Sequence, residues 1–357
     1  MVWRPDSLVV FLVSFAATFI VMPKAIASLR ALKAGQVIQE DGPQGHASKA
    51  GTPTMGGLAI LFGTLFGCAW IAYRRLAASG SYPDDHGGAL SFAAVLLLVV
   101  FYAAIGAADD WLTVRPRNGV RGIGSKPKFL LQLAGAVAFV GWLAWSGNLS
   151  TEVNLGFWFR ADLGWGYAPL AVLFITGMAN FINITDGLDG LAAGLTIILA
   201  AALVGIAGTV EMGGIRYPVN HPWLALVLLA FGGACAAFLW YNFNPARVFM
   251  GDTGSLAIGA AIPAVAIVTK LEIPAIIAGM VFILDGLSSA LQWAVFKYTR
   301  IKTGTGRRVF KMSPIHHHFE LSGWPEQLVV VRFWVLGALF ALAALLAYTR
   351  GFPWGLG

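Results

Sequence analysis

Residues 90–111 read LSFAAVLLLVVFYAAIGAADDW, and this stretch decides the fold class. No charged residue occurs from position 90 to position 108, and two adjacent carboxylates, Asp109 and Asp110, follow directly. An apolar run of about 20 residues is long enough to cross the hydrocarbon core of a bilayer as a helix. The stretch therefore predicts a membrane-spanning helix with acidic groups at one of its ends.

The rest of the chain has the same character. Of its 357 residues, 58% are hydrophobic and 11% are charged, whereas soluble domains have about 45–50% and about 25%. Mean hydropathy is +0.74, which excludes an ordinary soluble protein and a disordered one. We predict an all-α polytopic integral membrane protein, a single transmembrane catalytic domain over residues 1–357, with about ten transmembrane helices. The apolar runs lie at 8–28, 55–73, 90–108, 128–147, 167–183, 188–208, 222–241, 255–270, 273–297 and 329–349.

Lys and Arg residues predict the orientation of the chain. If the N-terminus lies outside, 17 of the 24 Lys and Arg residues fall in inner loops or just inside the last helix, and 7 fall outside. Cytoplasmic loops carry the excess of positive charge in membrane proteins. Both termini are therefore predicted to be extracytoplasmic. Cys68 and Cys235 lie in apolar stretches, so we expect no disulfide framework.

Acidic residues gather at the predicted inner ends of the helices, at one membrane depth. They are Asp109, Asp110, Asp186, Asp189 and Asp252. Carboxylates near hydrocarbon are costly, so a set at one depth suggests a metal site or a reacting centre. The alternative is that these helix ends are hydrated and that the acids serve solubility.

The contexts of these acids suggest different functions. Asp109 and Asp110 close a helix that runs inward, where the helix dipole opposes a negative charge, and this suits a proton acceptor. Asp252 lies in the sequence GDTGS (251–255) before a helix that runs outward, where the dipole favours an anion and a divalent cation could bind. Asn183, Asp186 and Asp189 are three residues apart, so a helical or turn-like path places their oxygen atoms on one side, as Mg²⁺ prefers.

The last predicted inner loop contains three consecutive histidines, His316, His317 and His318. Neighbouring residues of a helix point about 100° apart, so a zinc site made by all three is disfavoured. They suit hydrogen bonding to phosphate or sugar oxygens, and the alternative is a His-rich surface turn. Lys49 and Thr54, in KAGTPTMGG (49–57), add a cation and a hydroxyl at the same membrane face.

Five motifs resemble the phospho-N-acetylmuramoyl-pentapeptide transferase family, within the polyprenyl-phosphate N-acetylhexosamine-1-phosphate transferase superfamily. They are KAGTPTMGG (49–57), ADDW (108–111), NFINITDGLDG (180–190), NFNPARVFMGDTGSL (242–256) and PIHHHFE (314–320). The resemblance implies a bacterial inner-membrane enzyme with its active site facing the cytoplasm, a Mg²⁺ requirement and a homodimer. It also implies the reaction, in which undecaprenyl phosphate and UDP-N-acetylmuramoyl-pentapeptide give lipid I and UMP.

The resemblance further implies a function for individual residues. It makes Asp109 the base, Asp110 its partner, Asp252 the Mg²⁺ ligand and Asn183 a possible second ligand. It places a nucleoside pocket at Lys49, Asp186, Asp189, Asn242 and Phe249, with Phe249 stacked on uracil. It places His316, as a further catalytic group, and His317 near the phosphates and the sugar, with Thr54 and His318 as further substrate-binding residues. Asp285 stands where the family usually has Glu.

Two other functions remain open from the sequence. One is a sibling transferase that uses a UDP-N-acetylhexosamine without a peptide, against which the HHHFE run argues. The other is a secondary transporter of a phosphorylated solute, but transporters commonly bind near the bilayer midplane and contain repeated halves, which this sequence lacks. No feature predicts a nucleic-acid partner.

Overall fold

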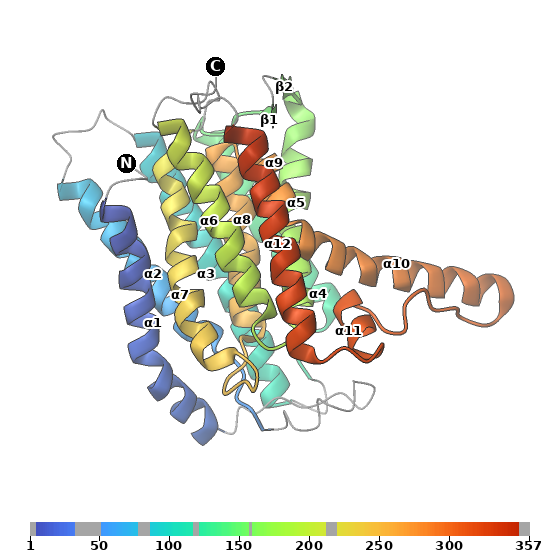
Figure 1. Ribbon diagram of the computed structural model, residues 1–357. Coiled ribbons are helices and arrows are strands. Elements are labelled where there is room, and N and C mark those ends of the chain that lie inside the picture. The colour runs from blue at the N-terminus through green and yellow to red at the C-terminus, as the bar shows by residue number, and fades with distance from the viewer. Residues whose placement is uncertain are drawn as a thin grey trace, which may run out of the picture.

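The computed structural model describes residues 5–32, 51–77, 86–116, 121–156, 159–211 and 220–349. It is a bundle of long helices with one small β-hairpin (Figure 1). In chain order the elements are α1 (Pro5–Ala31), α2 (Gly57–Ala77), α3 (His86–Val114), α4 (Ser125–Trp145), β1 (Glu152–Gly156), β2 (Phe159–Asp162), η2 (Gly164–Gly166), α5 (Tyr167–Thr185), α6 (Leu191–Glu211), η3 (Pro222–Ala225), α7 (Leu226–Asn242), α8 (Gly251–Thr269), α9 (Glu272–Ala278), α10 (Met280–Thr303), α11 (Ile315–Glu320) and α12 (Glu326–Thr349).

Ten helices of the described chain are long and apolar enough to cross a membrane, which confirms the predicted number. Each predicted run overlaps one of them, including the short run at 255–270, which is α8. The hairpin β1–β2 is the exception to the all-α prediction. It pairs antiparallel between α4 and α5, where the sequence has no long apolar run.

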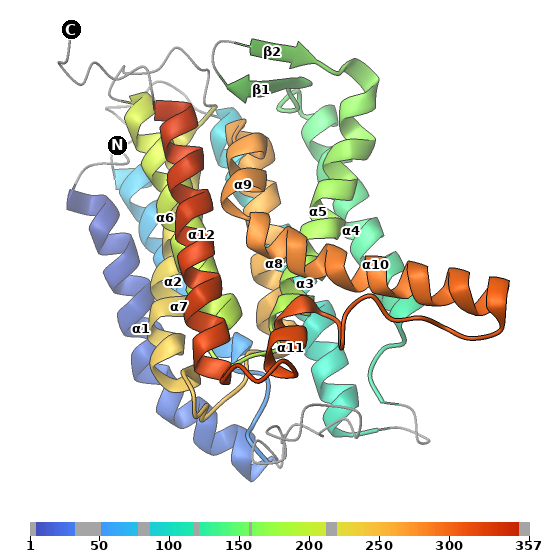
Figure 2. The same cartoon turned by 45° about the vertical axis from the view of Figure 1, so that its right-hand side comes forward.

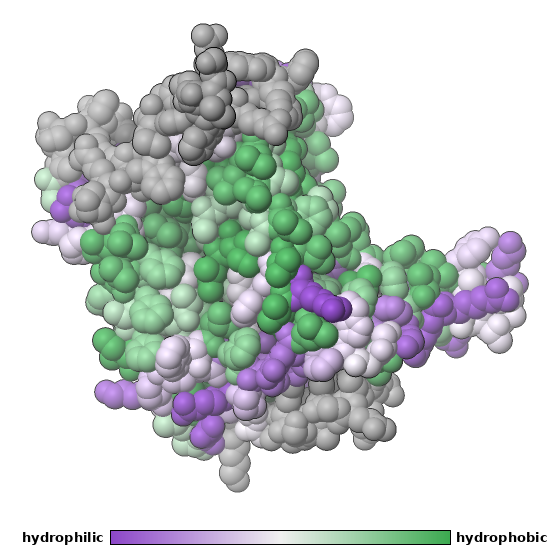
Figure 3. All heavy atoms as spheres, viewed as in Figure 1, coloured by the Kyte–Doolittle hydropathy of each residue, from purple (hydrophilic) through white to green (hydrophobic). Residues whose placement is uncertain are grey.

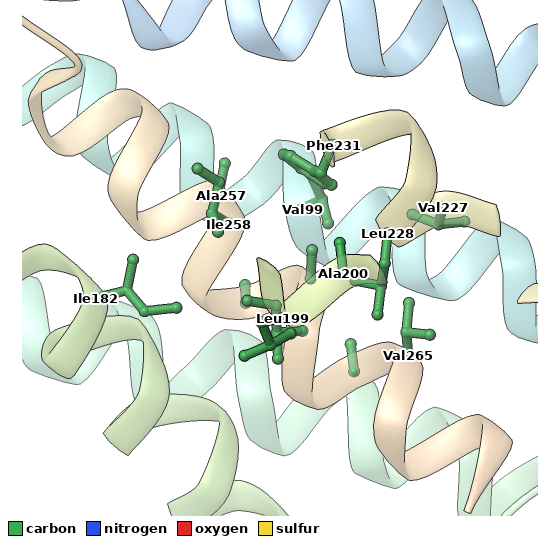
Figure 4. Packing of buried hydrophobic residues seen from close by; sticks show 14 of the residues in the cluster. Val99, Ile182, Leu199, Ala200, Val227, Leu228, Phe231, Ala257, Ile258 and Val265 are labelled. Carbon is green, nitrogen blue, oxygen red and sulfur yellow. The ribbon is translucent and has the colours of Figure 1, made fainter. Parts of the chain in front are cut away.

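Helix α8 forms the centre of the bundle. It packs against α3 on one side and α5 on another, and every residue from Thr253 to Thr269 is buried. Figure 4 shows its side chains Ala257, Ile258 and Val265 among the apolar residues of neighbouring helices. Because other helices surround α8, the residues of its first turn can be contacted by several of them.

The outer surface of the bundle is apolar. Large side chains such as Leu97, Leu130, Leu173 and Leu339 are exposed on it, and hydrophobic residues cover much of the face in Figure 3. A soluble protein rarely exposes so wide an apolar surface. The structure therefore supports a multi-pass membrane protein.

Two ends of the bundle can be distinguished. At the lower end in Figures 1 and 2, α3 and α5 finish and α8 begins; we name this the site end. The opposite, hairpin end carries β1–β2, and both the start of α1 and the finish of α12 lie on that side. The two ends of the described chain thus share one side of the bundle, away from the site end.

The ninth apolar run is not one straight helix. It breaks at Gly279 between α9 and α10, and α10 projects sideways from the bundle as an arm (Figure 2). The arm exposes Leu284, Leu287 and Leu291, whereas its buried side chains include several polar ones. Apolar groups outside and polar groups inside are the arrangement expected of a helix in contact with lipid.

A buried polar cluster fastens the hairpin end. The Lys270 ammonium donates to the Ser150 carbonyl at 3.0 Å, to the Tyr167 hydroxyl at 3.0 Å and to Glu272 Oε1 at 2.6 Å. Burial lowers the pKa of Lys270, although Glu272 opposes the shift. Lys270 is one of the seven Lys and Arg residues that the predicted orientation places outside. Because its side chain is buried and has three hydrogen-bond partners, it connects parts of the protein and is not a surface charge.

Candidate active site

Three charged side chains from different helices meet at the site end. Lys128, in the first turn of α4, places its ammonium 2.7 Å from Asp252 Oδ2 and 3.4 Å from Asp109 Oδ2. The backbone amide of Ile123 donates to Asp109 Oδ1 at 2.7 Å. The structure thus brings together Asp109 and Asp252 around a single cation.

Asp110 points away from its neighbour. It lies in α3 but caps the first turn of α8, accepting the amides of Asp252 and Thr253 at 3.0 Å each and the Thr253 hydroxyl at 2.6 Å. A carboxylate at a helix N-terminus satisfies amides that have no partner within the helix. Asp110 therefore positions Asp252, and the catalytic function that the resemblance implies for it stays a prediction.

Glycines allow these helices to meet so closely. A Cβ atom on Gly106 of α3 would overlap the carbonyl group of Asp252, and one on Gly57 of α2 would overlap the backbone of Gly254. Gly251 has a φ of +71°, and a Cβ atom there would sit 2.6 Å from an oxygen of Asp110. The start of α8 is therefore accessible to Asp110 only because these positions lack side chains.

We expect Gly106→Ala to lower both stability and activity. Its methyl group must displace the Asp252 carbonyl, and overpacking of this kind costs about 1–3 kcal/mol. Thermal unfolding in detergent and the rate of catalysis measure the two effects. Gly141→Ala, on α4 with open space around its Cβ position, is the control; equal behaviour of the two variants would contradict the close-approach argument.

Asn183 supports Asp252 from α5. Its Nδ2 donates to Asp252 Oδ1 at 2.8 Å and to the Ser255 hydroxyl at 2.9 Å. In the described residues, no three His, Cys, Asp or Glu side chains form a ready-made metal cluster. Mg²⁺ characteristically uses one or two carboxylates and completes its shell with water and substrate phosphates. Two carboxylates that already share a cation fit such an ion, with Asp252 as a ligand and Asn183 available only through its Oδ1.

The turn between α5 and α6 carries Asp186 and Asp189, with different surroundings. Burial and the carboxylates of Asp252, Asp110 and Asp189, in that order, raise the pKa of Asp186 well above its usual range. Asp189 Oδ2 instead accepts the Asn244 amide group at 3.0 Å and the Ala246 backbone amide at 3.1 Å. Asp186 therefore lies near the carboxyl groups of Asp110 and Asp252, and we name these three residues the acidic centre. Asp189 instead fixes the loop between α7 and α8, residues 243–250.

Asn242 and Phe249 lie at the two ends of that loop. Asn242 is buried and bridges two backbones, since it accepts the Gly190 amide and donates to the Val248 carbonyl, both at 2.9 Å. Phe249 is half-buried, and its backbone pairs with Pro53 and Gly56 at 2.8 Å. Thr54, which stands between Pro53 and Gly56 in the sequence, is buried. Lys49 lies outside the described residues.

The three histidines face different partners from the short helix α11. His316 is fully buried against Asp285, with 2.8 Å between Nδ1 and Oδ2. His317 Nδ1 lies 2.6 Å from Glu320, and its ring centre is 4.2 Å from that of His316. His318 Nδ1 accepts the Lys311 amide at 3.1 Å, so only the first two rings lie together beside Gly187.

The sequence that forms this site is similar to known transferases. Residues 92–270 match the family described as glycosyl transferase family 4. Residues 49–61 match signature 1 of the phospho-N-acetylmuramoyl-pentapeptide transferases. A transferase of that name from Halalkalibacterium halodurans is 42% identical over 339 residues, which cover 95% of this chain and 96% of the relative.

The chain belongs to the phospho-N-acetylmuramoyl-pentapeptide transferase family. Two further transferases of the same name agree. The one from Shouchella clausii is 43% identical over 94% of this chain and 95% of its own length. The one from Synechococcus sp. (strain WH7803) is 42% identical over 90% of this chain and 83% of its own. The chain is therefore a phospho-sugar transferase.

Two site residues of this transferase were not singled out from the sequence. Lys128 belongs to a run of basic residues, with Arg115, Arg117, Arg121 and Lys126, that adds positive charge at the predicted inner face or only sets the orientation of the chain, and nothing in the run distinguishes Lys128 from the others. Glu326, at the start of α12, accepts the Asp189 amide at 2.9 Å and the Asn244 amide group at 3.1 Å. No sequence motif identifies either residue, because their partners are remote in sequence: Asp109 and Asp252 for Lys128, and Asp189 and Asn244 for Glu326.

Proposed function

We propose that the protein transfers phospho-N-acetylmuramoyl-pentapeptide from its UDP-linked form to undecaprenyl phosphate, which yields lipid I and UMP. The observation that carries the proposal is the bridge Asp109–Lys128–Asp252 at the site end. The family membership and the names of the relatives supply the substrate class.

The reaction exchanges one phosphoanhydride bond for another. An oxygen of the lipid phosphate forms a bond to the phosphorus that carries the sugar, and the bond from that phosphorus to UMP breaks. Both partners are anionic, so the main barrier is their mutual repulsion, and fixed cations and positioning reduce it. Lys128 supplies one such cation, and Asp109 lies beside it to accept a proton or to orient the nucleophile.

We assign Mg²⁺ to the same place. When bound, it would neutralise charge on the diphosphate and polarise the reacting phosphorus. Asp252 would hold it, and Asp110 and Asn183 would fix the position of Asp252 through its backbone amide and its side chain. This assignment rests on the donor set and on the shared cation described above.

A purified-protein assay for UMP release tests the proposal. Release should require the UDP-linked substrate, undecaprenyl phosphate and Mg²⁺ together. If UDP-N-acetylglucosamine replaces the muramoyl-pentapeptide substrate equally well, the protein is a sibling transferase. Uptake of labelled UDP-sugar into proteoliposomes without UMP release would instead indicate a transporter.

The site end should face the cytoplasm of a bacterial inner membrane, with both termini outside. The distribution of Lys and Arg supports this orientation, and Lys126 lies at the site end, at the start of α4. We expect a single Cys at position 126 to be unreactive toward an impermeant reagent added outside intact cells. A Cys at position 216, outside the described residues, should react. Labelling of position 126 from outside would invert the orientation.

We expect Phe249→Ala to weaken binding of the UDP-linked substrate while leaving affinity for the lipid unchanged. Loss of a stacking contact with a base costs about 1–3 kcal/mol in single-stranded nucleic-acid complexes, and the half-buried ring has a backbone fixed at both ends. Phe243→Ala, in the same loop and packed on Trp334 with ring centres 6.1 Å apart, is the matched control. Isothermal titration with each substrate measures the effect, and equal losses for both substrates would contradict stacking.

The resemblance also leads us to propose a homodimer. Its test is the mass of the detergent-solubilised protein after subtraction of the detergent. A monomer that retains full activity would show that the site is complete within one chain.

A further inference from the structure

The arm α10 carries a buried polar stripe, made by Asp285, Ser288 and Gln292. Their spacing of three and four residues places them on one face of the helix. Polar groups within a membrane protein are costly unless they have partners or a function. We therefore expect each of the three side chains to have a partner or a function.

Two members of the stripe hold the segment that leads to the histidines. Gln292 Oε1 accepts the amides of Val309 and Phe310 at 2.8 and 2.9 Å. Ser288 Oγ accepts the amide of Ile315 at 2.8 Å. These contacts fix the backbone of the segment and do not reach an imidazole ring.

Asp285 differs because it contacts both the imidazole ring and the backbone amide of His316. Its Oδ1 accepts the His316 amide at 3.3 Å, and its Oδ2 lies 2.8 Å from His316 Nδ1. Both side chains are completely buried. A carboxylate against one ring nitrogen fixes the proton there and sets the orientation of the ring.

The other ring nitrogen of His316 differs from Nδ1 in its surroundings. His316 Nε2 is buried and has no hydrogen-bond partner among the described residues. A Cβ atom on Gly187 would lie only 2.6 Å from it, so a larger residue at position 187 could not pack against the ring without displacing it. Among the described residues, Asp285 and His317 contact the ring, and Asp186 precedes Gly187 in the chain. An unsatisfied buried nitrogen beside the acidic centre indicates a place for a substrate atom.

We infer that Asp285 is a positioning residue, which holds the proton of His316 on Nδ1 and directs Nε2 at the diphosphate of the nucleotide substrate. The inference rests on the proposed function, since it assumes that a diphosphate binds there. Asp285 touches no substrate and acts only through the imidazole. When the ring carries both protons, Nε2 donates to a phosphate oxygen.

Asp285→Asn tests this with almost no change of volume. The neutral amide can turn its NH₂ group toward Nδ1, as an Asn does in a His-Asp catalytic pair. The ring then keeps a single proton, on Nε2, and lacks the positive charge of the doubly protonated form that attracts the diphosphate. We expect kcat to fall about 10- to 100-fold, by analogy with residues behind a metal-bound histidine. KM for the UDP-linked substrate should change less than about twofold. Asp285→Glu should restore most of kcat, because it returns the carboxylate.

The ¹⁵N NMR signals of histidine-labelled protein give a readout that does not depend on activity. The protein has six histidines, and the spectrum of His316→Gln identifies the ring in question. Its Nδ1–H signature should be present in the unmodified protein, lost in Asp285→Asn and retained in Ser288→Ala. The last variant removes the Ile315 contact and leaves the ring contact intact.

Two results would overturn the inference. One is an unchanged Nδ1–H signature in Asp285→Asn. The other is equal loss of kcat in the Asn and Glu variants together with equally lowered thermal stability, which would mean that Asp285 serves packing alone. If the unmodified protein releases no UMP, the proposed function fails, and the NMR comparison still decides whether Asp285 sets the state of the ring.

Discussion

Asp252→Asn should abolish transfer at every pH tested, with a loss of about 10³-fold. The carboxylate lies in the first turn of α8, is held there by Asn183 and Lys128, and is the group best placed to bind Mg²⁺. Excess Mg²⁺ should restore little activity, because an amide lacks the charge that holds the ion. Steady-state rates between about pH 7 and pH 9 measure this.

Asp109→Asn should behave differently when the rates are extended down to about pH 5. The second pKa of a phosphate monoester is about 6, so the dianionic form of the nucleophile, which needs no base, increases steeply between about pH 5 and pH 7 and little above that. Activity that Asp109→Asn loses at the acidic end should therefore recover in part as the pH rises to about 7. Recovery of Asp252→Asn alone would reverse the two assignments, and recovery of neither would make Asp109 a positioning group. Asp162→Asn, an exposed residue at the hairpin end, is the control for added amide groups.

Lys128→Met should cost about 10²-fold in kcat, the second of the large effects. The substitution keeps the length of the side chain but leaves Asp109 and Asp252 facing each other without their shared cation. The two anionic substrates would then approach a site with more negative charge. The measurement is kcat and KM for both substrates at saturating Mg²⁺.

Lys126→Met is the matched control for this prediction. It removes the same charge from the same turn of α4, but from an exposed position. Its activity should stay close to that of the unmodified protein. Equal losses in both variants would mean that the overall positive charge of the site end matters and that the specific bridge does not.

The helices were predictable from the sequence because each spanning helix needs a long apolar run, and this requirement is local. The ninth run shows the limit of that reasoning. Hydropathy predicts one helix over 273–297, whereas the chain breaks at Gly279 and α10 leaves the bundle. The direction of a helix after a break depends on packing, which hydropathy does not contain.

The site was predictable to a lesser extent. Asp109, Asp186 and Asp252 stood out because charge is rare in an apolar chain, and the structure gathers them at one end. The pairing of Asp109 with Asp110 was harder to interpret, because adjacent residues of a helix point about 100° apart. Asp110 finds its partners at the start of α8, and the closeness of α3 and α8 cannot be read from either segment alone.

The position of His316 has a consequence for how the protein is made. Asp109 lies on the third long helix of the chain, and Asp252 begins the eighth, but the buried imidazole and its partner Asp285 come from the segments just before the last helix. During synthesis, the ribosome must release almost the whole chain before these groups can meet. A nascent chain that has inserted only its first eight helices carries its acidic residues but lacks this pair. With the function proposed for His316, we therefore expect catalysis to begin only when insertion is nearly finished.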